Sequence, residues 1–403
     1  MKIAIIGAGI TGLTAGYYLS QRKHQVSIFE KENHVGGLSS GFKNQGWDWQ
    51  LEDFFHHLFT SDKAAINLTK ELGLEKQLFF TQPKSSIYWR GQINQFDSPI
   101  SVLKYTPLTF LDRIRTGLVT AYLKTISRWE YLEKITAYEW LKKYYGGQVF
   151  KILWQPLLVG KFGKDAPQIS MAWFWARIKK RSQRLGYLEG GFQLLIDNLE
   201  KSIKANKGNL ILNQEIGDLA RLTKSFNKVI ITTPTQAFFK TKLPIMLGAV
   251  NLILTLKESF LTDGTYWLNI NEPGFPFVAM VEHTNFIDKK YYGDNRILYV
   301  GGYYPQNHRY FKMTKEQILN EFLPYLKKVN PKFNQLSIIN YQLSINFYAQ
   351  PVMPVNYSQI TPPMKTAISN VYLANMQNTY PWDRGINYAI EQGEKVANEV
   401  LKD

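Results

Sequence analysis

KIAIIGAGITG, residues 2–12, joins an apolar run to three glycines with Gly-x-Gly-x-x-Gly spacing. The apolar residues predict a buried parallel strand that ends at Gly7 and a helix that starts near Gly9. Gly7 permits a tight turn, Gly9 lets the backbone approach a diphosphate, and Gly12 lets the helix pack closely on the strand. The free N–H groups of the first helical turn then face the phosphates. This stretch therefore predicts a dinucleotide-binding βαβ unit.

A second apolar strand, residues 25–29, follows the predicted crossover helix of residues 13–21 and leads directly into Glu30. Glu30 lies about 20 residues past the glycines, where a carboxylate accepts hydrogen bonds from ribose hydroxyls. The alternative is that the three glycines only form turns in an α/β protein. Strand, helix and acid all agree with the glycine spacing, which favours the binding site.

Gly36 and Gly37, in VGGLSS at residues 35–40, place another glycine turn shortly after Glu30. This arrangement resembles the signature of the FAD-dependent amine oxidase, protoporphyrinogen oxidase and phytoene desaturase superfamily, in which the glycine pair lies against the FAD diphosphate. The superfamily usually has Arg after the pair, whereas this chain has Leu38. The resemblance implies FAD as the cofactor. We expect it to be non-covalent, because the sequence has no Cys for a thioether link.

The resemblance extends to the C-terminal part. Residues 370–376, NVYLANM, are similar to the superfamily's last strand before the flavin, with Asn375 in place of its usual Asp. Residues 380–387, YPWDRGIN, lead into a helix predicted over 388–401. In the superfamily the N-terminus of this helix points at the flavin pyrimidine ring, where its partial positive charge stabilises negative charge. Arg384 would add a full charge there, and the alternative is a surface helix after a Pro-Trp turn.

Candidate site residues follow from these motifs. We predict that FAD contacts Gly7, Ala8, Gly9, Ile10, Thr11, Gly12, Glu30, Lys31, Gly36, Gly37, Leu38, Ile216, Thr233, Asn375, Met376, Gly385 and Ile386. Because a flavin supplies the hydride acceptor, a catalytic acid or base is optional. The candidate catalytic residues are His57, Tyr348 and Arg384.

His57 belongs to FFHHLFTSD, residues 54–62, where relatives approach the flavin with a Gly-x-His or Gly-Gly-His segment. One interpretation is a proton carrier near neutral pH. The other is a structural histidine that caps a helix near Ser61. We predict no metal site, because no matching Asp or Glu spacing follows His56 and His57.

The expected fold class is α/β: a Rossmann-like FAD-binding domain with an interleaved α+β substrate domain, which has a helical part and an antiparallel sheet. The 403 residues exceed one typical domain. We assign residues 1–75, 186–235 and 366–403 to the discontinuous FAD-binding domain. The substrate domain is assigned residues 76–185 and 236–365, within which residues 155–163 read as a loop.

The net charge of +16 raises the question of partners. It fits attraction to anionic lipid, nucleic acid or a phosphorylated substrate, but a general excess of lysine spread along the chain is favoured. No nucleic-acid-binding motif occurs, so we expect a small-molecule substrate and no nucleic acid. Leu111, Ile114, Leu118 and Tyr122 recur at helical spacing. A core-facing helix is favoured, and a basic amphipathic helix on a membrane is the alternative.

The chain has no window of 18 uninterrupted apolar residues and no signal-peptide pattern, so no membrane span or leader is predicted. The absence of Cys is consistent with a reducing compartment. We expect a cytoplasmic protein, with peripheral contact at a membrane surface left open. The sequence does not predict an oligomeric state.

We expect an FAD-dependent oxidase or dehydrogenase that transfers a hydride from a C–N or C–C bond of an apolar or amine-like substrate to flavin N5. Aromatic candidates for its pocket are Tyr303, Tyr304, Phe347, Tyr348 and Trp382. A UDP-galactopyranose-mutase-like enzyme is the alternative, because residues 57–62 are similar to that group's His-x-Phe stretch. Its diphosphate would require residues such as Arg177, Arg309, Tyr303 and Tyr348. A flavin-binding scaffold without catalysis is a third possibility.

Overall fold

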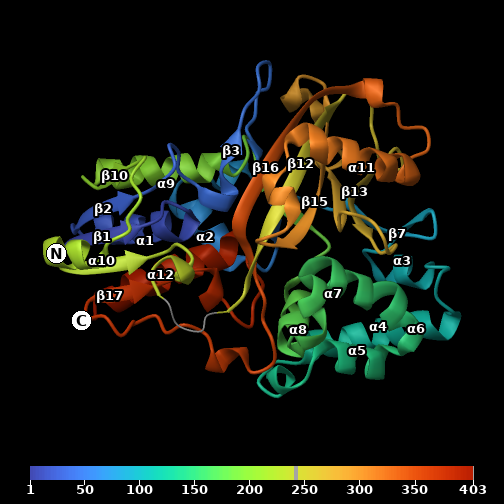
Figure 1. Ribbon diagram of the computed structural model, residues 1–403, viewed down its shortest axis with the longest axis horizontal. Coiled ribbons are helices and arrows are strands. Elements are labelled where there is room, and N and C mark those ends of the chain that lie inside the picture. The colour runs from blue at the N-terminus through green and yellow to red at the C-terminus, as the bar shows by residue number, and fades with distance from the viewer. Residues whose placement is uncertain (240–243, 403) are drawn as a thin grey trace.

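The structure is a computed structural model that describes residues 1–239 and 244–402, with two large sheets side by side and helices around them (Figure 1). Residues 240–243 and 403 belong to two of the predicted domain segments and lie outside the described residues. The first sheet is parallel, with strand order β10-β2-β1-β11-β17. Its strands are β1 (Lys2–Ile6), β2 (Gln25–Phe29), β10 (Asn209–Ile211), β11 (Lys228–Ile231) and β17 (Val371–Leu373).

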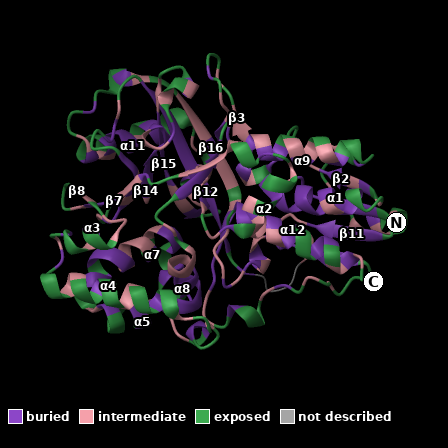
Figure 2. Cartoon of the chain, turned by 180° about the vertical axis from the view of Figure 1, so that it is seen from behind, coloured by how far each residue is buried: buried purple, intermediate pink, exposed green. Residues whose placement is uncertain are grey.

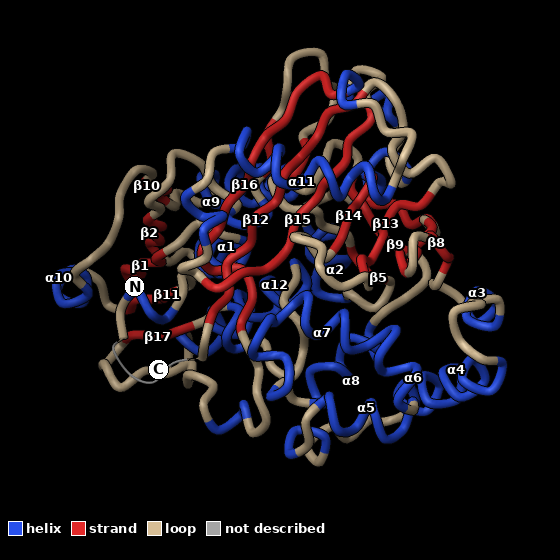
Figure 3. The backbone as a smooth tube through the Cα atoms, turned by 45° about the vertical axis from the view of Figure 1, so that its right-hand side comes forward, coloured by secondary structure: helices blue, strands red, loops and turns tan. Residues whose placement is uncertain are grey.

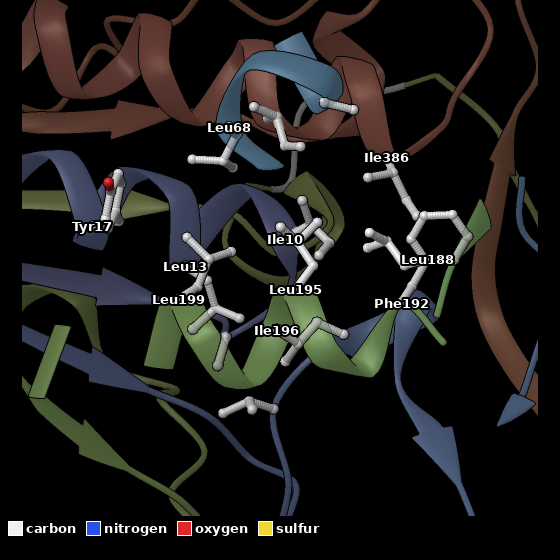
Figure 4. Packing of buried hydrophobic residues seen from close by; sticks show 14 of the residues in the cluster. Ile10, Leu13, Tyr17, Leu68, Leu188, Phe192, Leu195, Ile196, Leu199 and Ile386 are labelled. Atoms are coloured by element: carbon white, nitrogen blue, oxygen red, sulfur yellow. The ribbon is translucent and has the colours of Figure 1, made fainter. Parts of the chain in front are cut away.

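Both faces of this parallel sheet are buried, as βαβ connections require. Alternate residues of β1 enter different cores: Ile3 and Ile5 the larger one, Ala4 and Ile6 a smaller one. Figure 4 shows the larger core packed between helices. These helices are α1 (Ile10–Gln21), α2 (Lys63–Glu71), α9 (Gln193–Ala205) and α12 (Ile386–Val400), while α10 (Leu219–Ser225) packs beside β11. The predicted α/β, Rossmann-like class is confirmed.

The strands of the parallel sheet come from three separate stretches of the chain, as the predicted three-part FAD-binding domain requires. The domain bounds themselves stay a prediction. Between these stretches the chain builds a second sheet with the order β16-β12-β15-β14-β13-β7-β8, antiparallel except for the pair β13 and β7. Its strands are β7 (Lys84–Trp89), β8 (Gln92–Gln95), β12 (Met246–Leu256), β13 (Thr265–Ile270), β14 (Ala279–Glu282), β15 (Arg296–Pro305) and β16 (Ile338–Pro351), and α11 (Lys315–Val329) packs on it.

A layer of helices lies below the second sheet (Figure 3). It contains α3 (Pro99–Leu103), α4 (Phe110–Thr125), α5 (Ala137–Tyr145), α6 (Gly147–Val149), the π-helical turn Phe150–Trp154, α7 (Gln155–Phe162) and α8 (Met171–Lys180). The expected loop at 155–163 is therefore wrong, because most of it is α7. Pro156 lies in the first turn of α7, directly after the π-helical turn, and Gly163 ends the helix with a φ of +55°.

The apolar stripe of α4 faces solvent. Leu111, Leu118 and Tyr122 are 78%, 67% and 54% exposed, and Ile114 is also exposed. The opposite side of α4, with Leu123, packs into the helical layer (Figure 2). The favoured expectation that this stripe faces the core is therefore wrong. No helix in the described part of the chain combines the length and apolarity that a membrane span needs.

Short strands join the two halves of the molecule. They are β3 (Gly41–Phe42) paired with β4 (Leu51–Glu52), and β5 (Leu58–Phe59), β9 (Leu185–Leu188) and β6 (Leu78–Thr81) in a small sheet. Glu52, which is 1% exposed, accepts hydrogen bonds from the Tyr187 hydroxyl at 2.7 Å and the Phe192 N–H at 2.6 Å. The Tyr299 hydroxyl on β15 donates to the Glu52 backbone oxygen at 2.7 Å. Burial raises the pKa of Glu52 to about 7, although the hydrogen bonds from Phe192 and Tyr187 oppose the shift.

We predict that Glu52 makes the fold less stable as pH rises. Its carboxyl has a pKa raised from 4.5 to about 7 in the folded state, so folding favours the protonated form. The free energy of unfolding should therefore fall between these two pKa values, by on the order of 3 kcal/mol. Glu52→Gln should remove this dependence. Denaturant unfolding with FAD held constant, at about pH 5 and about pH 8, measures it; a parallel pH profile for both proteins would contradict the assignment.

Candidate functional site

Two glycine turns meet where β1 ends and α1 begins, and we call residues 7–12 together with Gly36 and Gly37 the glycine cradle. Gly7 and Gly36 have φ values of +101° and +114°, which side-chain-bearing residues rarely adopt. The Gly36 N–H donates to the Ala8 backbone oxygen at 2.8 Å, so the second glycine turn is fastened to the first. A Cβ on Gly12 would lie 2.0 Å from the Gly7 oxygen, so the start of α1 packs against the turn at a distance that only glycine allows.

The cradle fits a dinucleotide. A Cβ on Gly9 would meet no protein atom within 4 Å, so the space in front of this backbone is open. The first turn of α1 has no side-chain cap, which leaves its N–H groups available to phosphate oxygens. Glu30 accepts from the Ala8 N–H at 2.7 Å, so its carboxylate is held at the edge of the turn. The Thr233 Oγ1 is buried without a hydrogen-bond partner among the described residues. These features suit the phosphates and hydroxyls of FAD.

The structure also places three other predicted FAD contacts, Ile216, Lys31 and Asn375. The Gln214 N–H donates to the Glu30 backbone oxygen at 2.8 Å, which brings the loop with Ile216 next to Glu30. Lys31 points to solvent and pairs with Glu32. The side chain of Asn375 accepts from the Gln377 N–H at 2.9 Å and donates to the Thr233 backbone oxygen at 2.8 Å. Its polar atoms are thus engaged within the protein, and contact with FAD would fall to the backbone of residues 375–376.

A cavity of about 230 Å³ opens between the FAD-binding half and the seven-stranded sheet. Of the predicted site residues, it is lined by Leu38, His57, Arg384, Gly385 and Ile386. The uncapped N-terminus of α12, at Gly385 and Ile386, therefore faces this space. Its apolar wall consists mainly of Phe54, Phe55, Phe59, Leu157 and Trp267.

The aromatic residues expected in the pocket are mostly elsewhere. Among them Tyr303 lines the cavity, whereas Tyr304 is buried with its hydroxyl on the Pro276 backbone oxygen, and Phe347 is 46% exposed. Trp382 stacks behind the lining residue Tyr388. Tyr348, a candidate catalytic residue, does not line this cavity. It lies on β16, the edge strand of the seven-stranded sheet, where the register against β12 shifts, and sequence position alone did not reveal which surface its side chain reaches.

One buried carboxylate organises the charged side of the cavity. Asp383 accepts from Lys161 Nζ at 2.9 Å and from the guanidinium of Arg177, and the Trp173 indole N–H donates to it at 3.2 Å. Burial alone would raise the pKa of Asp383, but Lys161, Arg177 and Arg384 hold it well below its usual range. Asp383 is therefore ionised and holds α7, α8 and the start of α12 together.

Arg384 is fixed next to this carboxylate. Its guanidinium donates to the Tyr303 hydroxyl and to the Gln350 side-chain oxygen, the latter at 3.1 Å. The sequence indicated Arg384 but missed Lys161, since α7 read as a loop. The conspicuous signal for the cluster was the charged pair within YPWDRGIN, residues 380–387.

His57 lies in the cavity wall, with Nδ1 3.3 Å from the Tyr266 hydroxyl. Burial and the positive charges of Arg181, His56 and Arg177 lower its pKa to about 3. His57 is therefore neutral near pH 7, which disfavours the proton-carrier interpretation. The helix-capping alternative is wrong, because Asp62 is the residue that precedes α2. Within residues 1–239 and 244–402, no group of three or more His, Asp or Glu side chains forms a metal site.

Comparison with known proteins agrees with this geometry. Residues 10–246 and 241–401 match the family model described as flavin containing amine oxidoreductase. Coproporphyrinogen III oxidase of Staphylococcus aureus is 24% identical over 291 residues, which cover 59% of this chain and 61% of that protein. The 15-cis-phytoene desaturase of Synechococcus elongatus is 29% identical over 158 residues, 36% of this chain and 33% of that protein. The chain thus spans only part of the length of these relatives.

Solved structures extend the fold similarity to the whole chain. Reduced UDP-galactopyranose mutase superposes with a TM-score of 0.76 at 14% identity, covering 100% of this chain and 95% of that chain. Putrescine oxidase bound to putrescine superposes with a TM-score of 0.69 at 14% identity, covering 100% of both chains. At these identities the two structures establish the shared fold.

Gly9→Val should abolish flavin content without unfolding the protein. The new side chain would meet no protein atom near its Cβ, but it would occupy the open space in front of the cradle. Gly117→Val on α4 is a matched control, because its Cβ also meets nothing within 4 Å and it lies far from the cradle. Absorbance of the purified proteins and FAD released on denaturation measure the effect. Stoichiometric flavin in Gly9→Val would rule out this cradle as the diphosphate site.

Proposed function

The chain belongs to the flavin containing amine oxidoreductase family, whose cofactor is FAD, and we propose that it is an oxidase or dehydrogenase. The reaction is hydride transfer from a C–N or C–C bond of an apolar or amine-like small molecule. The single observation that carries this proposal is that one cavity is lined both by the N-terminus of α12 and by an aromatic wall. When bound, FAD supplies the hydride acceptor in this reaction.

The chain's own residues bind the cofactor, orient the substrate and exclude water. The cradle and Glu30 would hold the diphosphate and ribose, while the α12 N-terminus at Gly385 would stabilise negative charge that develops beside it. Phe55 and Trp267 present an apolar surface that orients a flat substrate and excludes water. Neutral His57 takes part as a hydrogen-bonding group, so proton transfer through it is not required.

A second candidate function is the UDP-galactopyranose-mutase-like reaction on a sugar nucleotide. The observation that favours it is that Arg177 and Tyr303, two residues that a diphosphate would require, both line the cavity. The other two fit less well, because Arg309 is 65% exposed and paired with Glu321 at 2.6 Å, and Tyr348 lies outside the lining.

We also propose that the protein acts in the cytoplasm, at the surface of an anionic membrane. The outward stripe of α4, together with Ile100 and Leu103 of α3, forms an exposed apolar face on a chain of net charge +16. An apolar face on a basic protein fits the interface of anionic lipids. The C-terminal end of α4 also touches the cavity wall, because Lys124 Nζ donates to the Arg181 backbone oxygen at 2.9 Å.

Anaerobic titration tests the reaction class. We expect an amine, polyene or porphyrinogen donor to bleach the bound flavin, whereas UDP-sugars should not compete. Binding of UDP-galactose without bleaching by any donor would favour the second candidate. Arg384→Ala should slow bleaching by on the order of 10²-fold with FAD retained, since it removes a preorganised cation at the α12 N-terminus. Arg309→Ala, outside the cavity, is the control for loss of a surface cation.

Vesicle flotation tests the membrane proposal. The protein should float with vesicles of phosphatidylglycerol and phosphatidylcholine, and not with phosphatidylcholine alone. Leu111→Ser with Leu118→Ser should weaken partitioning by at least about tenfold, because each exposed leucine loses its transfer into the interface. The matched control is Leu336→Ser with Ile339→Ser, two exposed apolar residues away from α4. Equal partitioning of the two double variants would overturn the assignment of this face.

A further inference from the structure

The cavity carries more positive than negative charge. Its cationic lining residues are Lys161, Arg177, Lys180, Arg181 and Arg384. The carboxylates in the described lining are Asp62 and Asp383. Asp383 is already shared between Lys161 and Arg177, and Asp62 accepts the Phe59 N–H at 2.8 Å. Two carboxylates therefore face five cations, and the excess positive charge calls for an anion in the cavity.

The excess lies at the C-terminal end of α8. Arg177 and Lys180 are one helical turn apart and Arg181 follows immediately, so the three side chains reach the same wall. Lys180 Nζ lies 4.7 Å from the centroid of the Trp382 ring. Neither Lys180 nor Arg181 forms an ion pair with another residue in the described ranges.

Helix-end electrostatics alone does not account for this arrangement. Basic side chains often stabilise the carbonyl end of a helix. Lys179 does so for α4, by donating to the Lys124 backbone oxygen at 2.6 Å, and it does not line the cavity. The other three cations instead converge on the cavity, where they repel one another unless an anion lies between them. Burial is the main reason that the pKa of His57, another lining residue, is lowered, and the positive charges of Arg181 and Arg177 lower it further.

We propose that Arg177, Lys180 and Arg181, which we call the cationic corner, bind a carboxylate or phosphate group of the substrate. This inference rests on the proposed function, because the cationic corner and the reaction share one cavity. The apolar wall at Phe55 and Trp267 receives the rest of the molecule. The substrate is therefore an amphiphile with an anionic end, so among the donor classes of the proposed function the cationic corner favours an acidic molecule over a protonated amine.

Two probes of opposite charge and equal apolar length test the cationic corner. Decanoate and decylamine are titrated into the FAD-loaded protein at low ionic strength, with calorimetry and flavin absorbance as readouts. We expect decanoate to bind at least about tenfold more tightly than decylamine. Lys180→Gln with Arg181→Gln should reduce this preference to near unity. Arg221→Gln with Lys224→Gln on α10 removes the same two charges far from the cavity and should leave it unchanged.

The competing outcomes are distinct. Equal binding of the two probes by the wild-type protein, or a preference retained in Lys180→Gln with Arg181→Gln, would overturn the cationic corner. Competition of UDP or inorganic pyrophosphate with decanoate assigns the anion to a diphosphate, and lack of competition assigns it to a carboxylate. Because these measurements need no turnover, an anion preference without bleaching by any donor would reject hydride transfer alone. Bleaching without an anion preference would reject the cationic corner alone.

Discussion

The close contact between two glycine turns is the constraint on which the molecule depends. Gly36 donates to Ala8 at 2.8 Å, and a Cβ on Gly37 would lie 3.3 Å from the Gly9 Cα, so no side chain fits between the turns. This bare stretch of backbone leaves room for a diphosphate and aligns α1 with it. Because β1 is buried on both faces, the turns are anchored to the buried core.

Local patterns predicted this half of the protein well. The glycines, the apolar strands and Glu30 belong to one motif of about 30 residues, so their spacing can be recognised in the sequence. The cavity is different, because its walls come from α7, α8, β13, β15 and α12, and convergence of distant segments leaves no local signature. Lys161 was missed since Pro156 and two glycines made α7 read as a loop. Tyr348 was predicted in the site wrongly, because the sequence of a strand does not determine which surface an aromatic side chain reaches.

The apolar periodicity of α4 shows where the pattern itself is ambiguous. Helical spacing of Leu111, Leu118 and Tyr122 predicts a face that avoids water, but the spacing cannot tell a protein core from a lipid surface. Here the buried side of α4 is marked by Thr116 and Leu123, so most of the apolar area points outward. The excess of lysine, favoured as a property of composition alone, is locally organised at the cavity, where Lys161 and Lys180 serve defined contacts.

The order of strands in the parallel sheet has a consequence for synthesis on the ribosome. β1 and β2 emerge first, yet the sheet receives β10 and β11 only after residue 209, and β17 with α12 only after residue 371. The nascent chain must therefore carry an incomplete sheet edge through most of translation. The free edge of β1 is covered when β11 arrives, and the free edge of β11 is covered only when β17 arrives, so chaperone binding to these edges would protect them in turn.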